Sequence, residues 1–223
     1  MTIDLYYLPL SPPCRAVMLT IEALGIDVNY KTLNILNGEH LTQEYEEMNP
    51  QRTIPFMVDD DVKLSESRAI MGYLVDQYGS DSNLYPTELN ARALVNQFLQ
   101  FDAGKLYSSM SAYYYPRVFQ GQDLDESKLP PLKDGFDVLN KILENKDFVT
   151  GENLTIADLT LIATTSTAEV LGFDFEEYPN VSSWIERVKS AIPGFEAVNG
   201  DVVKFKEFFN KPEEEPGEEP EEE

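Results

Sequence analysis

The chain has 223 residues, 42% of them hydrophobic and including twelve Phe and twelve Tyr, which is enough material for two buried cores. Its formal net charge is −23 at pH 7, and −15 remains when the eight glutamates of residues 213–223 are set aside. A field of this sign repels phosphate backbones and anionic lipid. We therefore expect neither a nucleic-acid-binding nor a membrane-surface protein.

The single cysteine, Cys14, excludes an intramolecular disulfide. Residues 1–10 lack the basic segment and long apolar stretch of a secretory signal. No apolar run approaches the roughly 20 residues that span a bilayer. These features predict a cytoplasmic protein, and we expect no metal site.

Residues 1–79 are expected to form an α/β domain that binds the co-substrate. Val17, Ile21 and Leu24 recur at helical spacing after two prolines and stop at Gly25, and residues 28–35 alternate as a strand does. This βαβ unit predicts a parallel pair of strands. The remaining elements give the order βαβαββα, the thioredoxin-like arrangement with a four-stranded mixed sheet. We expect strands at 5–8, 28–35, 56–58 and 62–64, and helices at 12–25, 42–48 and 65–79.

Residues 80–88 are rich in Ser, Asp and Pro and are predicted to be a linker. Residues 89–211 then show only helical patterns and predict an all-helical bundle domain with helices at 89–119, 131–144, 155–171, 181–191 and 201–209. Thr155 and Asp158 have the spacing of a capping box, and Asn180 is expected to cap the following helix. Residues 212–223 contain only Pro, Gly and Glu, and we expect a disordered acidic tail.

Ser11 is the first candidate for chemistry. The run Ser11-Pro12-Pro13-Cys14 occupies the position of the redox-active C-x-x-C motif at the start of the first helix of a thioredoxin-like fold. A serine there excludes a dithiol cycle, but its hydroxyl can donate a hydrogen bond to the sulfur of a bound thiol. Lowering a thiol pKa from roughly 8.5 to near 7 requires only about 2 kcal/mol. An ordinary N-cap explains the same serine equally well.

Two further features have simple structural explanations as well as functional ones. Cys14 is expected to be a small buried side chain. Ile54-Pro55 stands at a turn before a predicted strand, where a cis bond would leave the Ile54 backbone free to pair with an extended peptide. A trans turn proline is the alternative.

Residues 65–68, Ser-Glu-Ser-Arg, begin the last helix of the first domain. Ser65 is expected to cap this helix, whose free N–H groups attract a carboxylate. Glu66 could receive an α-ammonium group at the same place. The run therefore fits the end group of an α-amino acid, with a plain capping turn as the alternative.

Taken together, these runs resemble the insect delta-class (delta/epsilon-like) cytosolic glutathione S-transferases from Leu5 to about Phe209. The motifs are Leu8-Pro9-x-Ser11-x-Pro13-Cys14-Arg15, Gly38-Glu39-His40, Asn49-Pro50-Gln51-Arg52-Thr53-Ile54-Pro55, Glu66-Ser67-Arg68-Ala69-Ile70 and Tyr113-Tyr114-Tyr115-Pro116. The resemblance implies a homodimeric insect enzyme of xenobiotic detoxification that conjugates reduced glutathione, its co-substrate, to hydrophobic electrophiles.

By matching position, the resemblance implies that Ser11 activates the glutathione sulfur. It further implies that glutathione is bound by His40, Arg52, Thr53, Ile54, Pro55, Glu66, Ser67 and Arg68. Candidates for the hydrophobic substrate site are Pro13, Tyr107, Met110, Tyr113, Tyr114, Phe119, Phe205 and Phe208, and we expect about half of them to be packing residues.

The chain departs from the family pattern at four positions. Arg52 stands where the family usually has His, and a guanidinium can still bind a carboxylate. Ser65 replaces a usual Trp, Gln100 a usual aromatic residue and Ala103 a usual Met, which affects the expected dimer contact and the floor of the substrate pocket.

Two other functions remain open from the sequence. A non-catalytic ligand carrier or structural protein on the same fold would keep glutathione affinity without turnover, and a glutaredoxin-like oxidoreductase would depend on Cys14. Peroxide reduction and dehydrohalogenation would use the same thiolate as conjugation does. The intact Ser11 favours conjugation, because a carrier has no need of an activated sulfur.

Overall fold

The computed structural model describes residues 3–209, except for the side chain of residue 208. The first part of the chain forms a mixed sheet with the strand order β2-β1-β3-β4, in which β1 is parallel to β2 and antiparallel to β3. The predicted thioredoxin-like arrangement is confirmed. Its elements are β1 (Ile3–Tyr7), α1 (Pro12–Leu24), β2 (Val28–Thr32), the 3₁₀ turns η1 (Ile35–Asn37) and η2 (Glu39–Leu41), α2 (Gln43–Met48), β3 (Phe56–Asp59), β4 (Val62–Leu64) and α3 (Ser67–Tyr78).

The boundaries of α1 follow from its end residues. Pro12 and Pro13 fit the first turn, where a missing N–H costs nothing, and Gly25 ends the helix in the left-handed conformation at φ 64°. The predicted strand at 28–35 is too long. The side chain of Asn34 accepts a hydrogen bond from the backbone N–H of Leu36 at 3.0 Å, which starts the turn η1 in place of a longer strand.

The second part of the chain is helical, as predicted. The helix expected over 89–119 consists of two helices joined by a π-helical turn. The elements are α4 (Leu89–Phe101), the π turn η3 (Asp102–Leu106), α5 (Tyr107–Gln120), η4 (Glu126–Lys128), α6 (Leu129–Ile142), α7 (Ile156–Val170), α8 (Pro179–Ala191), α9 (Phe195–Asn199), η5 (Gly200–Lys204) and α10 (Phe205–Phe209). No helix within residues 3–209 is long and apolar enough to cross a membrane.

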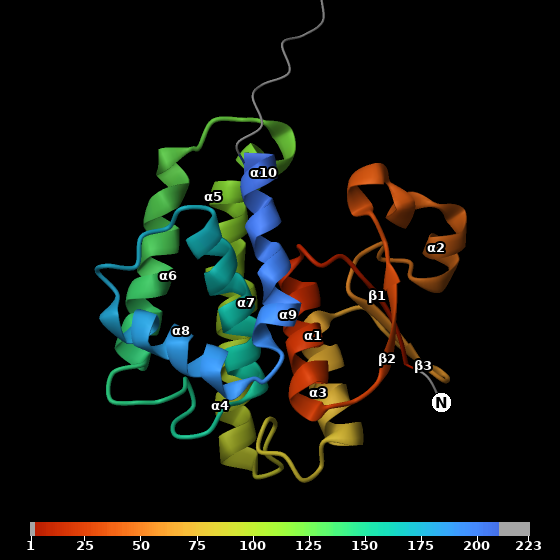
Figure 1. Ribbon diagram of the computed structural model, residues 1–223, viewed down its shortest axis with the longest axis horizontal. Helices are drawn as coiled ribbons and strands as arrows, with labels where there is room; N and C mark the ends of the chain where they lie inside the picture. The colour runs from red at the N-terminus through yellow and green to blue at the C-terminus, as the bar shows by residue number, and fades with distance from the viewer. Residues whose placement is uncertain (1–2, 210–223) are drawn as a thin grey trace, which may run out of the picture.

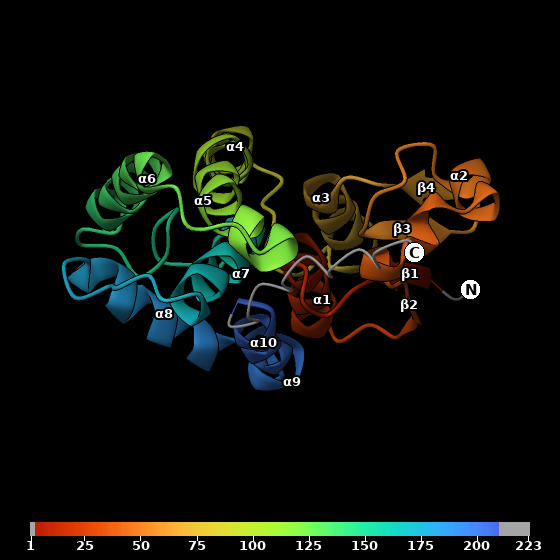
Figure 2. The same cartoon turned by 90° about the horizontal axis from the view of Figure 1, so that it is seen from above.

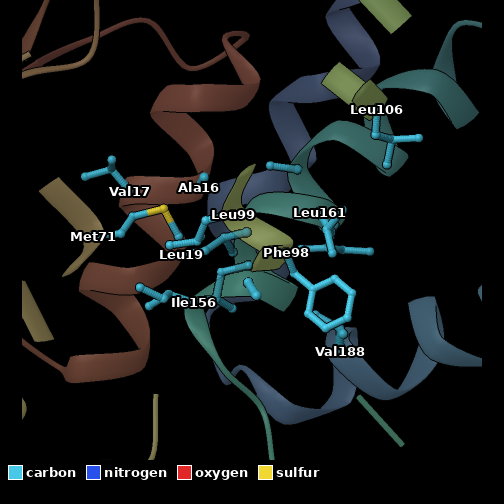
Figure 3. Packing of buried hydrophobic residues seen from close by; sticks show 14 of the residues in the cluster. Ala16, Val17, Leu19, Met71, Phe98, Leu99, Leu106, Ile156, Leu161 and Val188 are labelled. Carbon is cyan, nitrogen blue, oxygen red and sulfur yellow. The ribbon is translucent and has the colours of Figure 1, made fainter. Parts of the chain in front are cut away.

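The two parts meet along α1. Figures 1 and 2 show α1 and α3 between the sheet and the second group of helices, with α2 on the outer side of the sheet. α1 packs against α3 and, in the other direction, against α7. Fully buried side chains of both parts form one continuous cluster (Figure 3), in which Val17 and Met71 lie near Leu99 and Ile156. Helix α1 therefore places its first turn, with Ser11, at the junction of sheet and helices.

The predicted capping box of α7 is confirmed. The Asp158 carboxylate accepts hydrogen bonds from the backbone N–H and the hydroxyl of Thr155, at 2.9 and 3.0 Å. The cap predicted at Asn180 is wrong, because α8 already begins at Pro179. The side chain of Asn140, on α6, accepts instead from the N–H groups of Asn180 and Val181 at 3.0 and 3.3 Å. A residue 40 positions away thus caps this helix.

Candidate active site

Strand register brings the candidate residues to one edge of the sheet. Tyr7 at the end of β1 pairs with Thr32 at the end of β2. Tyr6 also pairs with Phe56 at the start of β3, and Leu64 at the end of β4 pairs with Met57. The segments that follow β1, β2 and β4, and the segment that precedes β3, therefore leave the sheet at the same edge. These segments carry Ser11, His40, residues 66–68 and residues 52–55.

A cavity of about 330 Å³ opens at this edge, between the sheet and the helices. One wall comes from the loops of the first part and the other from α5 and α10. It is lined by Leu8, Leu10, Ser11, Pro13, Ile35, Leu36, His40, Arg52, Thr53, Ile54, Tyr107, Tyr115, Phe119 and Phe205. Polar groups and aromatic rings thus face the same space from opposite sides.

Ser11 lies in this cavity as the residue just before α1. Its backbone is extended, at φ −67° and ψ 120°, and its N–H donates to the carbonyl of Leu8 at 3.0 Å. The side chain makes no capping hydrogen bond. Pro12 and Pro13 have no N–H, so the first turn of α1 offers few backbone donors to a ligand. The half-buried Ser11 hydroxyl therefore caps no N–H of α1; it lies close enough to the Cys14 thiol to lower that thiol's pKa, and it can donate a hydrogen bond to a ligand in the cavity.

Cys14 does not reach the cavity. Its side chain is fully buried, and burial raises the pKa of its thiol to about 11. The thiol is therefore protonated at neutral pH, which is the opposite of what a redox-active cysteine requires.

The turn before β3 presents free backbone groups. The Ile54-Pro55 peptide bond is cis. The Thr53 carbonyl is occupied, since it accepts from the Tyr45 hydroxyl at 2.7 Å and from the Asn49 amide at 2.9 Å. The backbone N–H and C=O of Ile54 have no hydrogen-bond partner within residues 3–209. They can pair with an extended ligand in the cavity.

Two basic side chains stand at the polar wall. The buried Nδ1 atom of His40 has no hydrogen-bond partner in the described part of the chain. Arg52 adopts a left-handed backbone at φ 53°, and its guanidinium lies 4.0 Å from the exposed carboxylate of Glu46. An exposed pair at this distance is weak, so the guanidinium remains available to an anion.

The start of α3 differs from the prediction at one residue. Ser65 was expected to cap this helix, but α3 begins at Ser67 with Glu66 as its N-cap residue, in an extended backbone. The strand ends at Leu64 as predicted, but two residues, Ser65 and Glu66, lie between it and the start of the helix, so the cap falls on Glu66. Glu66 is exposed and Ser67 is buried. Neither these two residues nor Pro55 and Arg68 line the cavity defined above.

Arg68 connects α3 to the helical part of the chain. Its guanidinium forms an ion pair with Asp102, which is fully buried in the π turn after α4. Asp102 also accepts hydrogen bonds from the hydroxyls of Thr160 and Thr164 on α7, at 2.7 and 2.8 Å. Burial raises the pKa of the Asp102 carboxyl, against the opposite effect of Arg68. Asp102 was not predicted from the sequence, although a lone acid among Phe98, Leu99, Phe101 and Leu106 and the two threonines four residues apart on α7 were visible signals.

The aromatic wall contains half of the predicted substrate-site residues. Pro13, Tyr107, Phe119 and Phe205 line the cavity. Tyr115, which was not predicted for this role, lines it too. Its ring lies against Phe119, with centroids 5.0 Å apart, and stacks on Phe205 at 6.4 Å.

The other candidates lie elsewhere. Tyr107, Tyr115 and Phe119 share one side of α5, whereas the buried side chains of Met110, Tyr113 and Tyr114 point into the helical core. The Tyr113 hydroxyl donates to Glu126 at 3.1 Å, away from the cavity. The side chain of Phe208 lies outside the described residues.

Within the described part of the chain, no group of three or more His, Cys, Asp or Glu side chains could hold a metal ion. Acidic side chains are also absent from the cavity lining given above. The arrangement has instead hydroxyl groups, among them that of Ser11 at the start of α1, free backbone groups, basic side chains and an aromatic wall. It can hold an extended anionic peptide with a thiol beside an apolar compound.

Comparison with known proteins agrees with this arrangement. Residues 5–82 match the family model described as glutathione S-transferase, N-terminal domain, and residues 93–191 match glutathione S-transferase, C-terminal domain. A delta-class glutathione transferase of Nilaparvata lugens is 47% identical, with a TM-score of 0.89 over 93% of this chain and 98% of that one.

Two further solved structures are similar over nearly the whole chain. A glutathione transferase of Bombyx mori is 43% identical, with a TM-score of 0.88 over 94% of this chain and 97% of that one. A glutathione transferase homologue of Drosophila mojavensis with bound glutathione is 32% identical, with a TM-score of 0.88 over 93% of this chain and 96% of that one. The chain therefore belongs to the glutathione S-transferase family, and its similarity to insect enzymes includes the delta class.

Proposed function

We propose that the cavity binds glutathione with its sulfur at the Ser11 hydroxyl and an electrophile against the aromatic wall. As a glutathione transferase, the protein joins the glutathione sulfur to a hydrophobic electrophile. The observation that carries the assignment of Ser11 is the position of its side chain, which does not cap α1 and lines the cavity between the polar and aromatic walls.

The chemical step follows from this placement. The bound thiol loses its proton to solvent, and the Ser11 hydroxyl donates a hydrogen bond to the thiolate. The thiolate then forms a bond to the electrophilic carbon, and a leaving group such as halide departs with its electron pair. The cavity also holds both reactants together, which removes the entropic cost of their encounter from the chemical step.

The polar groups at the sheet edge suit the two ends of glutathione. We assign the backbone of Ile54, held by the cis bond to Pro55, to the cysteinyl unit, with Thr53 beside it. The unpaired His40 nitrogen and the guanidinium of Arg52 suit the glycine carboxylate. The guanidinium of Arg52 supplies local positive charge in a chain whose net charge is −23.

The γ-glutamyl end is assigned to the first turn of α3. The N–H groups there attract its carboxylate, the exposed Glu66 can receive its ammonium group, and Ser67 adds a hydroxyl. Arg68 supports this turn through its ion pair with Asp102. Strand register supports the assignment, because Leu64 pairs with Met57, close to the cis turn.

The electrophile is assigned to Pro13, Tyr107, Tyr115, Phe119 and Phe205. Aromatic walls of this kind select by shape and by apolar area more than by specific hydrogen bonds. Met110, Tyr113 and Tyr114 are assigned to packing behind that wall, because all three are buried outside the cavity lining.

The test compares Ser11→Ala with wild type in conjugation of glutathione to an activated aryl halide. Each unit of thiol pKa changes the thiolate fraction tenfold, so we expect kcat/KM to fall by about 10- to 100-fold near neutral pH. Ser190→Ala is the matched control, because among residues 3–209 the Ser190 hydroxyl donates only to the Glu186 carbonyl on α8. Equal activity of Ser11→Ala and wild type would overturn the mechanism, and a wild type that binds glutathione without turnover would overturn the enzymatic function.

We further propose a cytoplasmic homodimer. Its contact surface is assigned to α4, where Leu89 and Leu94 are 80% and 45% exposed although both are large and apolar. We also propose a domain division into residues 1–79, a linker at 80–88 and residues 89–211. Residues 212–223, the expected acidic tail, lie outside the described residues.

A further inference from the structure

Arg15 is a fully buried charge in the first part of α1. Its guanidinium donates to the carbonyl of Ala163 at 2.9 Å and to the hydroxyl of Ser166 at 3.0 Å, both on α7. It also donates to the hydroxyl of Thr167 and to the side-chain oxygen of Asn199 on α9. All of these acceptors are neutral. The guanidinium Nε has no hydrogen-bond partner within residues 3–209.

No carboxylate of the described residues lies within 4.0 Å of the Arg15 guanidinium. The titratable groups that face it are Cys14 and Tyr115, and both are neutral at pH 7 because burial raises the pKa of each. Burial lowers the pKa of Arg15 to about 10, so the guanidinium remains charged at neutral pH. A buried cation without a counter-charge is unfavourable, and proteins normally pair it.

The residue that carries this charge lies one helical turn after Ser11. The backbone N–H of Arg15 donates to the Ser11 carbonyl at 2.9 Å, so the two residues are one helical turn apart. Side chains on a helix tilt toward its N-terminus, which is the end that carries Ser11. Tyr115 lies between Arg15 and the cavity, since it faces Arg15 and also lines the cavity. Arg15 is fully buried and does not line the cavity, so solvent does not surround the guanidinium and its field is weakly screened.

We propose that Arg15 is a positioning residue for the conjugation reaction, whose buried guanidinium stabilises the bound thiolate at Ser11 as its missing counter-charge. This inference rests on the proposed function. Because Pro12 and Pro13 remove two backbone donors from the start of α1, the helix terminus contributes less than usual to the site. Arg15 supplies positive potential from behind the same turn.

The test adds a counter-charge to Arg15 without removing any of its contacts. Asn199→Asp is isosteric and keeps the oxygen that accepts from Arg15. We expect the pKa of the bound glutathione thiol, measured from the ultraviolet absorbance of the thiolate against pH, to rise by about one unit. The matched control is Asn140→Asp, which adds the same charge beside the start of α8 and should leave the thiol pKa unchanged.

A second pair of variants separates charge from packing. Arg15→Lys keeps the charge but loses hydrogen bonds, whereas Arg15→Met removes both. We expect Arg15→Lys to stay close to the wild-type thiol pKa and Arg15→Met, where it folds, to raise it. An unchanged thiol pKa in folded Asn199→Asp, or equal shifts in Asn199→Asp and Asn140→Asp, would overturn the role of Arg15. A wild type that binds glutathione without lowering its thiol pKa would instead overturn the role of Ser11.

Discussion

The chemistry at the start of α1 depends on which side chain, that of Ser11 or that of Cys14, reaches the cavity. Ser11 lines the cavity, and Cys14 is buried three residues later. In a dithiol oxidoreductase both positions would take part in the reaction. Here the protein provides a hydroxyl at the exposed position and an inert thiol behind it, so the reactive sulfur has to come from the ligand.

The native thiol of Cys14 should be unreactive. Its pKa is raised to about 11 by burial, so the thiolate that reacts with alkylating reagents is scarce as well as inaccessible. We expect alkylation by iodoacetamide at about pH 8 to be at least 100-fold slower in the native protein than in guanidinium chloride, counted by mass spectrometry. Cys14→Ala should keep full conjugation activity. Loss of activity in that variant would revive the glutaredoxin-like alternative.

Residue-level prediction worked where a role depends on neighbours in sequence. The burial of Cys14, which was predicted, follows from a helix start that any thioredoxin-like chain shares. Asp102 and Tyr115 were missed because their surroundings come from distant segments. Asp102 meets Arg68 and α7 only in the folded chain, and the side of α5 that faces the cavity is fixed by the π turn before it. The spacing of apolar residues alone could not show which side of α5 faces the cavity.

Among the elements, α7 occupies the centre of the molecule and its first turn is held from several directions. Besides its bonds to Thr155, Asp158 accepts from the backbone N–H of Val149 at 2.9 Å and from the indole N–H of Trp184 at 3.0 Å. The carboxylate therefore connects the loop before α7 with α8. Since α7 also carries acceptors of Arg15, this cap fixes the helix against which the active-site turn packs.

Asp158→Ala should strongly destabilise the protein. Truncation would leave the N–H groups of Thr155, Val149 and Trp184 buried without an acceptor, and we expect a loss of about 3–5 kcal/mol in the free energy of unfolding. Urea titration followed by circular dichroism would measure it. Asn140→Ala is the comparison, because it removes a half-buried cap from α8 and should cost about 1 kcal/mol. Similar losses in both variants would contradict the central role of Asp158.

Elements with strong local signals were predicted almost to the residue. The hairpin of β3 and β4, the end of α1 at Gly25 and the cap of α7 all depend on residues adjacent in sequence. The errors arise from long-range contacts. Asn180 does not cap α8, because the side chain of Asn140 on α6 accepts the hydrogen bonds at the start of that helix. The helix expected over 89–119 is interrupted at Asp102, which contacts Arg68 and α7.

For the whole molecule, the main prediction is dimerisation through α4. Leu94→Asp should weaken the dimer at least about tenfold, because a carboxylate would have to lose its water in an apolar contact. Sedimentation velocity over a range of concentrations would give the dissociation constant. Val203→Asp is the matched control, since Val203 is also a large exposed apolar residue, at 56%, but lies in η5. Equal dimer affinities of the two variants would place the interface elsewhere.

Net charge gives this dimer a characteristic salt dependence. Each chain carries −23, so two copies repel each other, and the repulsion extends over a Debye length of about 30 Å at 0.01 M salt but only about 8 Å at 0.15 M. Dimer affinity should therefore rise as salt is added, whereas an interface held mainly by ion pairs would weaken. The dependence should be steeper for Leu94→Asp than for Val203→Asp, because only the first adds its charge at the contact. If affinity falls with salt in the wild type, opposite charges and not the leucines of α4 hold the two copies together.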